Sequence, residues 1–143
     1  MKVVLMSMPD VAPIIIHEAA VHMPNLGIAS VGANIGPDHD VHIIDLVRKR
    51  NAVRKYLTRT LKKIEPDLVG LSAMTWQYDT CVRIAEMVRR ICPGAKIALG
   101  GYHATLMHEE IARSKESAFF DFIVRGEGEI PFSKLVEALA GRG

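Results

Sequence analysis

Five short apolar runs, separated by longer segments with helical spacing, form the dominant pattern of the chain. Most of these runs are continuous rather than alternating, which is typical of strands that are buried on both faces. The second run is interrupted by His42. We therefore predict five strands, over residues 3–6, 41–44, 68–71, 96–99 and 122–124.

The segments between the runs carry apolar residues three and four positions apart, which predicts amphipathic helices. This spacing is clearest in residues 53–64 and 78–91. Glycine and proline stand at the expected boundaries, for example at Pro66 and at Pro93-Gly94. Further helices are expected over residues 25–36, 109–114 and 130–140.

Strand and helix alternate five times, and such alternation predicts a parallel sheet with helices on both faces. Five such units in 143 residues fit a Rossmann-like or flavodoxin-like three-layer α/β domain with strand order 2-1-3-4-5. We expect a single domain over residues 1–143, because the sequence contains no internal repeat, low-complexity tract or linker.

Ligands of open parallel sheets bind at the carboxyl ends of the strands, near the point where the strand order switches. Here that point lies between the first and third strands. The segment after the first strand, residues 8–24, is long for such a loop and contains the apolar patch 14–16. The patch could fold back as a lid on its own domain, or it could face a ligand or a partner domain.

Small and hydroxyl-bearing residues follow the third and fourth strands. Ser72 and Thr75 offer hydroxyl groups after the third strand, although helix capping by Thr75 or Asp79 would also explain them. The pair Gly100-Gly101 follows the fourth strand, where it could let the backbone lie against a ligand or could form an ordinary tight turn.

Two further segments are candidates for the same edge. Glu127 and Glu129 follow the fifth strand, where carboxylates would also be favoured by the dipole of the next helix. The first predicted helix is rich in glycine and alanine, including Gly27 and Gly32, which lowers its intrinsic stability. Close packing on the sheet would explain these small residues, and so would a ligand tail between helix and sheet.

Composition excludes several classes of protein. The residues are 49% hydrophobic and 24% charged, which suits a packed core and argues against disorder. The 18 basic and 16 acidic residues leave a net charge of +2, which gives no reason to expect a nucleic-acid or membrane partner. There is no apolar run of membrane-spanning length and no secretory signal, so we expect a cytoplasmic protein.

Metal-site and nucleotide motifs are weak or absent. Segment 126–131 lacks the third glycine of a dinucleotide fingerprint, and the chain contains no phosphate-binding loop of the GxxxxGK[ST] type. The cluster of histidine and aspartate in residues 38–45 is better explained by a solvated turn with a half-buried His42. Cys81 and Cys92 are too far apart on one helix to share a metal, so we expect free thiols and no metal site.

Taken together, the motifs resemble the cobalamin-binding domain at the N-terminus of cobalamin-dependent radical SAM enzymes. The matching pieces cover nearly the whole chain, and GGYHAT at 100–105 and RGEGE at 125–129 carry the most weight; the pieces are residues 24–29, 41–45, 66–75, 98–105 and 121–129. The resemblance implies a corrin ring over the strand ends and a nucleotide tail between sheet and helices.

The resemblance also implies which residues contact cobalamin. The expected contacts are Ser72, Ala73, Met74, Thr75, Gly100, Gly101, Tyr102, His103, Ala104, Gly126, Glu127 and Gly128. Ser72 and Thr75 would bond the tail, residues 102–104 would border the corrin, and residues 126–128 would contact its far rim. We further expect that Gly101→Val weakens binding with little loss of fold.

One departure concerns cobalt. Related domains carry an Asp-x-His-x-x-Gly motif after the first strand, and its histidine ligates the metal. Residues 40–45 imitate only the start of this motif and lie in the second strand. We expect no histidine ligand from such a motif, although His17 and His22 lie in the loop after the first strand and remain candidates.

The CxxxCxxC motif that binds the 4Fe-4S cluster of radical SAM enzymes is absent from this chain. In the resembled methyltransferases and cyclases, that cluster and S-adenosylmethionine belong to a downstream domain. We expect either the N-terminal part of a longer enzyme or a stand-alone relative, with no catalysis by this chain alone. The alternative is a nucleotide-handling or protein-interaction domain of the same fold that binds no corrinoid.

Overall fold

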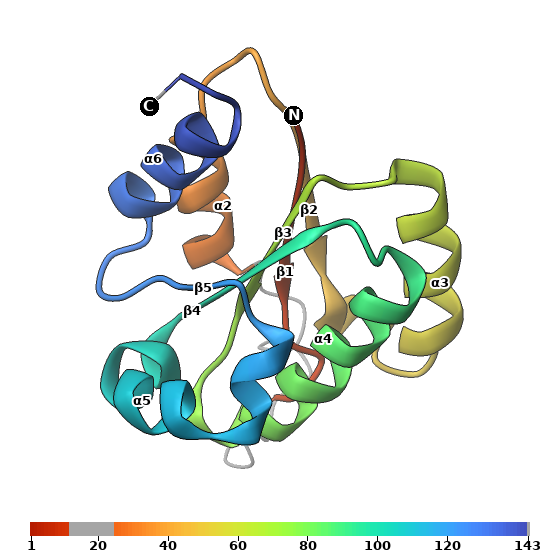
Figure 1. The fold of residues 1–143 in the computed structure, drawn as a ribbon. Helices are drawn as coiled ribbons and strands as arrows, with labels where there is room; N and C mark the ends of the chain where they lie inside the picture. The colour runs from red at the N-terminus through yellow and green to blue at the C-terminus, as the bar shows by residue number, and fades with distance from the viewer. Residues whose placement is uncertain (12–24, 143) are drawn as a thin grey trace.

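The computed structural model describes residues 1–11 and 25–142, and strands and helices alternate along them (Figure 1). Three short 3₁₀ segments, η1 Leu46–Lys49, η2 Thr75–Gln77 and η3 Lys115–Phe119, join the main elements. The main elements are β1 Lys2–Ser7, α2 Leu26–Ala33, β2 Asp40–Asp45, α3 Val53–Ile64, β3 Leu68–Ser72, α4 Tyr78–Ile91, β4 Lys96–Gly100, α5 Tyr102–Arg113, β5 Phe122–Ile123 and α6 Glu129–Leu139.

The strands form one parallel sheet in the order β2-β1-β3-β4-β5, which confirms the predicted topology. The order switches between β1 and β3: the chain continues from β1 to β2 on one side of this pair, and from β3 to β4 on the other side. In such sheets the crevice at the carboxyl ends of the two strands is the usual ligand site.

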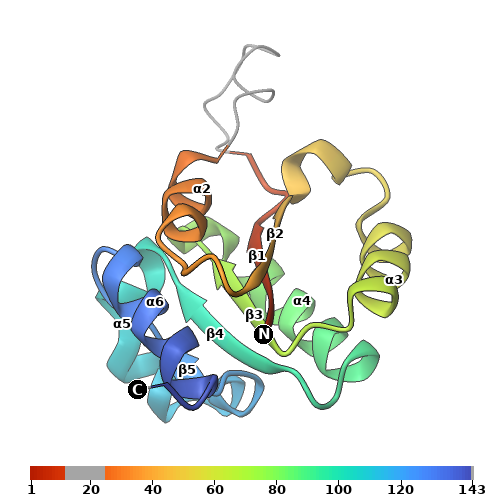
Figure 2. The same cartoon turned by 90° about the horizontal axis from the view of Figure 1, so that it is seen from above.

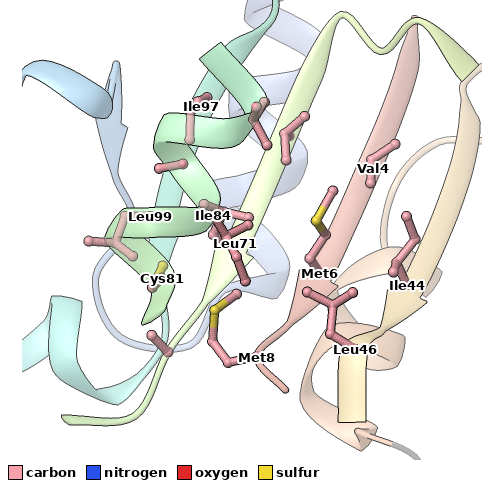
Figure 3. Packing of buried hydrophobic residues seen from close by; sticks show 14 of the residues in the cluster. Val4, Met6, Met8, Ile44, Leu46, Leu71, Cys81, Ile84, Ile97 and Leu99 are labelled. Atoms are coloured by element: carbon pink, nitrogen blue, oxygen red, sulfur yellow. The ribbon is translucent and has the colours of Figure 1, made fainter. Parts of the chain in front are cut away.

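Helices cover both faces of the sheet, so the domain has three layers: helices, sheet and helices (Figure 2). One face packs against α3, α4 and α5 through a core that includes Met6, Leu57 and Ile84. Figure 3 shows this core, with Ile84 of α4 above the strands. The other face packs against α2 and α6 through a smaller core around Ile28 and Phe132.

Most predicted boundaries agree with the structure to within one or two residues, but the helix predicted over residues 109–114 begins seven residues earlier than expected. It is the second half of α5, which begins at Tyr102 directly after Gly101. The glycine pair suggested a turn after the fourth strand, and no helix was predicted before residue 109. In the structure Gly101 has a φ of +92°, so one residue makes the turn and the helix follows at once.

The described residues include both cysteines but not all of the positions that the sequence analysis considered. Cys81 is buried, Cys92 is half-buried, and both are free thiols, as predicted. Burial raises the pKa of the Cys81 thiol to about 12. No described helix is long and apolar enough to cross a membrane. The apolar patch 14–16, His17 and His22 lie outside the described residues.

Candidate cofactor-binding groove

A groove of about 150 Å³ opens between the sheet and the helix pair α2 and α6, beside Gly100 and Gly101. Its floor is the face of the sheet that looks toward these helices. Side chains of a strand alternate between the two faces, so every second residue of each strand belongs to this floor. Two successive rows in the strand register contribute to it: Leu5, Gly70 and Ala98, then Ser72 and Gly100.

The groove exists because these rows contain very small residues. A Cβ atom at Gly70 would stand 2.7 Å from Leu5 Cδ2 and 2.9 Å from the Phe132 ring, so only glycine lets these side chains meet there. At Gly100 a Cβ would come no closer than 3.8 Å to Val124, which is ordinary contact. The missing side chain at Gly70 is therefore replaced by Leu5 and Phe132, whereas the missing side chain at Gly100 leaves space over β4.

Apolar side chains form the walls. Ile28 and Val31 of α2 line one side, and Phe132 of α6 lines the other. Helix α2 is positioned by its N-cap, because the Asn25 side chain accepts a hydrogen bond of 3.1 Å from the N–H of Ile28. The result is a slot with an apolar interior that opens at the carboxyl edge of the sheet.

The rim of the groove is polar and joins the two helices. Ser30 of α2 donates a hydrogen bond of 2.6 Å to Oε1 of Glu129, the first residue of α6. This bond, followed by backbone hydrogen bonding at the helix start, lowers the pKa of Glu129. A carboxylate at this position also suits the positive end of the α6 dipole. Glu129 therefore both stabilises the start of α6 and lines the groove.

Gly101 lines the groove at the carboxyl edge of the sheet, where β4 passes into α5. A Cβ atom there would lie 2.8 Å from both the N and the O of Ala73, and the positive φ of this residue favours glycine in any case. A valine at this position would therefore strain the fold. This contradicts the expectation that Gly101→Val leaves the fold largely intact; the neighbouring Gly100 is the position where a side chain has room.

The loops after β1 and β3 are tied together by Gln77. Its Nε2 donates to the backbone O of Asp10 at 2.8 Å, and its Oε1 accepts from the N–H of Met74 at 2.9 Å. Thr75 and Asp79 do not cap a helix here: the N-cap residues of η2 and α4 are Met74 and Gln77. Gln77, which the sequence analysis did not single out, holds this corner instead.

Half of the predicted contact residues line the groove. The structure brings together Ser72, Gly100, Gly101, Gly126, Glu127 and Gly128 from three segments distant in sequence. Their motifs were recognisable because each directly follows a predicted strand, and the carboxyl ends of parallel strands meet at one edge.

The other six predicted residues lie outside the groove. Ala73 and Ala104 are 1% and 0% exposed, so their side chains belong to the core. His103 is 8% exposed, and its ring lies 4.3 Å from that of Tyr78 with Nδ1 lacking a hydrogen-bond partner among the described residues. Met74, Thr75 and Tyr102 are exposed at the carboxyl edge of the sheet.

Several groove residues were missed. Gly70, Ala98 and Val124 lie in strands or at a strand end, where their apolar character was assigned to the core; the others missed are Leu5, Ile28, Val31, Leu71 and Phe132. Glu129, a candidate for this edge from the sequence, also lines the groove. The available signal was the alternation of side chains between the two faces of a strand. Small residues at every second position of two neighbouring strands, such as Gly70 and Ser72 beside Ala98 and Gly100, predict a gap over one face of the sheet. Gly27, noted for its size, does line the groove.

The histidine and aspartate cluster of residues 38–45 disperses in the structure. His39 is buried against Glu137, with Nε2 2.7 Å from Oε1, and the half-exposed His42 lies 3.1 Å from Asp40. Within residues 1–11 and 25–142, no group of three or more histidine, cysteine or acidic residues is arranged to hold a metal ion. His42 lies in the edge strand β2 and does not line the groove.

The fold and groove define a class: a Rossmann-like α/β domain with a ligand slot at the switch point of its sheet. Residues 12–136 match the B12-binding domain family, and the chain belongs to that family. Cobalamin (vitamin B12) is therefore the cofactor of its family, as the sequence motifs implied.

Similar proteins agree with this assignment. The chain is 33% identical over 82% of its length to an uncharacterized methyltransferase, PH0819, of Pyrococcus horikoshii, and covers 25% of that protein. It is 33% identical over 69% of its length to the anaerobic magnesium-protoporphyrin IX monomethyl ester cyclase of Cereibacter sphaeroides and covers 16% of it. The chain thus spans a quarter or less of these curated relatives.

Solved structures share the fold. The cobalamin-dependent S-adenosylmethionine radical enzyme OxsB, with aqua-cobalamin bound, matches 99% of this chain with a TM-score of 0.75 at 17% identity, over 19% of its own chain. The radical S-adenosylmethionine methyltransferase TsrM from Kitasatospora setae, with cobalamin and a [4Fe-4S] cluster bound, matches 99% with a TM-score of 0.69 at 19% identity, over 27% of its chain.

Proposed function

We propose that this chain is the cobalamin-holding domain of a radical SAM enzyme, with the nucleotide tail of the cofactor in the groove and the corrin ring over the strand ends. The observation that carries this proposal is the groove itself, which opens at the switch point beside Gly100 and Gly101. The match to the B12-binding domain family supports the choice of cofactor.

The groove suits such a tail. A Cβ at Gly100 would meet only ordinary contacts, so the space above this residue is free for a ligand. The walls from Ile28 and Phe132 are apolar, as a flat aromatic base requires, and the opening is polar, as a sugar and a phosphodiester require. The residues present therefore fit the group.

Each predicted contact has a definite place in this proposal. Ser72 supplies a hydroxyl inside the groove, Gly100 and Gly101 supply backbone at close range, and residues 126–128 form the rim. Met74, Thr75 and Tyr102 are exposed at the edge over which the corrin would lie. The buried Ala73, His103 and Ala104 would act by supporting that edge from below.

The proposal includes no cobalt ligand from an Asp-x-His-x-x-Gly motif. Asp40 and His42, which imitate its start, pair with each other on the edge strand β2. His17 and His22 lie outside the described residues and remain the other histidine candidates.

A nucleotide-handling function is less compatible with the groove. Among the residues that line it, the charged side chains are the carboxylates of Glu127 and Glu129, and none is basic. Two carboxylates repel a nucleoside di- or triphosphate, whereas they tolerate a single phosphodiester better because it carries less charge. The charge of the rim therefore favours a cobalamin tail.

The proposed whole protein is longer than this chain, because the matches cover only 25% and 16% of two similar curated proteins. In that protein a downstream radical SAM domain would bind S-adenosylmethionine and a 4Fe-4S cluster. The chemistry that cobalamin supplies in the resembled methyltransferases is the transfer of a methyl group. Residues 1–143 would hold and orient the cofactor without catalysing a reaction on their own.

Titration with hydroxocobalamin tests the proposal. The chain should retain a corrin absorbance spectrum after desalting from about 100 μM cofactor, a concentration that corresponds to only ~5.5 kcal/mol of binding free energy. Gly100→Val should weaken this binding at least about tenfold, since its side chain would enter the groove.

Gly94→Val is the matched control, because Gly94 has open space around it and lies in the turn before β4, at the opposite edge of the sheet. This variant should bind as the wild type does. A wild-type chain that retains no corrinoid would refute the proposed function. Equal binding by wild type and a folded Gly100→Val variant would refute the placement of the tail.

A further inference from the structure

A single hydroxyl group joins the two motifs that carry most of the resemblance. Thr105 Oγ1 donates to the backbone O of Gly101 at 3.0 Å and accepts from the N–H of Gly126 at 3.0 Å. The first bond is the ordinary contact of a helical threonine with the carbonyl four residues earlier. The second spans 21 residues and connects the start of α5 to the loop before α6.

Both partners of Thr105 are groove residues with unusual backbone. Gly101 has φ +92° and Gly126 has φ +69°, and both line the groove. Packing fixes Gly101 tightly against Ala73, but a Cβ at Gly126 would meet nothing within 4 Å. The position of Gly126 is therefore set by hydrogen bonds and chain connection more than by packing.

The loop from β5 to α6 has few other anchors on this side. The N–H of Val124 donates to Leu99 O at 2.8 Å before the loop, and the Ser30–Glu129 bond holds its far end. Between these two anchors lie residues 125–128, where Thr105 accepts from the N–H of Gly126 and the N–H of Phe132 donates to the O of Gly128 at 2.9 Å. Thr105 itself does not line the groove, so it acts on a ligand only through these loops.

We propose that Thr105 is a positioning residue that determines specificity: it fixes the mouth of the groove so that the domain prefers a complete cobalamin to a corrinoid without a nucleotide tail. This inference rests on the proposed function, since it needs the tail to enter the groove. The hydroxyl sets the distance between the Gly101 turn and the Gly126 loop, and a tail between them depends on that distance. The corrin ring, over the strand ends, depends on it much less.

Removal of the hydroxyl tests this role. Thr105→Val keeps the size and branching of the side chain but cannot bond either partner, whereas Thr105→Ser keeps the hydroxyl. We expect Thr105→Val to bind hydroxocobalamin about tenfold more weakly than the wild type, the change that ~1.4 kcal/mol produces. Binding of cobinamide, which lacks the nucleotide tail, should change by less than about twofold, and Thr105→Ser should restore the preference for cobalamin.

Both ligands are titrated by absorbance against wild type, Thr105→Val, Thr105→Ala and Thr105→Ser, with circular dichroism to verify folding. The alanine variant replaces the valine variant if valine prevents folding. Equal weakening of both ligands would show a merely structural role and would overturn the inference. So would unchanged cobalamin affinity in a folded variant, while the proposed function would stand. A wild-type chain that binds neither ligand would overturn the proposed function and the inference together.

Discussion

At the scale of single residues, glycines that look alike in the sequence have different roles. Gly70 lets Leu5 and Phe132 meet under the groove, Gly101 turns the backbone against Ala73, and Gly100 leaves room for a ligand. The sequence shows only that each lacks a side chain. Neighbouring atoms decide which glycine tolerates substitution, and so the sequence analysis chose Gly101 for a test that Gly100 serves better.

His103 is a residue whose environment the sequence did not reveal. Its ring packs on Tyr78, and its Nδ1 has no hydrogen-bond partner among the described residues. Burial lowers the pKa of His103 from its ordinary value of 6.5, and the nearby Asp79 offsets only part of this effect. The neutral imidazole is therefore the form that the fold favours.

We predict a pH dependence from this depressed pKa. Below about pH 6.5 the unfolded chain binds a proton at His103 that the folded chain does not, so the free energy of unfolding falls as the pH decreases from 6.5 to the folded-state pKa. His103→Phe should lose less stability between pH 7.5 and pH 5.5 than the wild type does. Urea unfolding at both pH values measures this, and parallel losses in the two proteins would contradict it.

At the scale of elements, β5 is the shortest strand and depends on one carboxylate at its start. Asp121 accepts from the N–H of Ile97 at 2.8 Å and pairs with the side chains of Arg89 and Lys96. Burial alone would raise the pKa of Asp121, but the hydrogen bonds from Ile97, Arg89 and Lys96 outweigh it and hold the pKa below 3.8. This residue joins β5 to β4 and to α4.

We predict that Asp121→Ala lowers the free energy of unfolding by roughly 1–3 kcal/mol at pH 7, because it leaves Ile97 N–H and Arg89 without their partner. Since the folded-state pKa of Asp121 is depressed, its contribution is complete above the unfolded value and is lost as the pH falls below 3.8. The difference between variant and wild type should therefore shrink in acid. Urea midpoints at pH 7 and pH 3 measure it, and a constant difference would contradict this origin.

Sequence patterns predicted the elements well where periodicity was strong. The range 78–91 agrees with α4, and 53–64 agrees with α3, because each shows one apolar face over three turns or more. The prediction missed the first half of α5, where Gly100-Gly101 suggested a turn. Whether a glycine pair gives a loop or an abrupt helix start depends on φ at Gly101, which long-range contact with Ala73 determines.

At the scale of the whole molecule, two cores of unequal size lie on the two faces of the sheet. The larger core, under α3, α4 and α5, stabilises the fold, and the smaller one, under α2 and α6, adjoins the groove. A ligand in the groove would add contacts on the side of the smaller core. Binding to the folded state alone should therefore stabilise the entire domain.

We predict that hydroxocobalamin at about 100 times its dissociation constant raises the free energy of unfolding by ~2.7 kcal/mol. The urea midpoint with and without cofactor measures this effect. Gly100→Val, at the same cofactor concentration, should show a smaller increase. An unchanged midpoint in a wild-type sample whose spectrum shows bound corrinoid would mean that binding is not confined to the folded state.

The sequence by itself determined the strand order, the three layers and the edge of the sheet at which the groove opens. Apolar periodicity and the alternation of strands and helices are local signals, and chain connectivity turns them into one topology. It also pointed to half of the predicted residues that line the groove, those that follow strands. The tertiary structure decided what depends on neighbours far along the chain: which glycine leaves space, which small residues align into a groove floor, and that Thr105 joins Gly101 to Gly126. Such pairings arise from packing between separate elements, which no local pattern encodes.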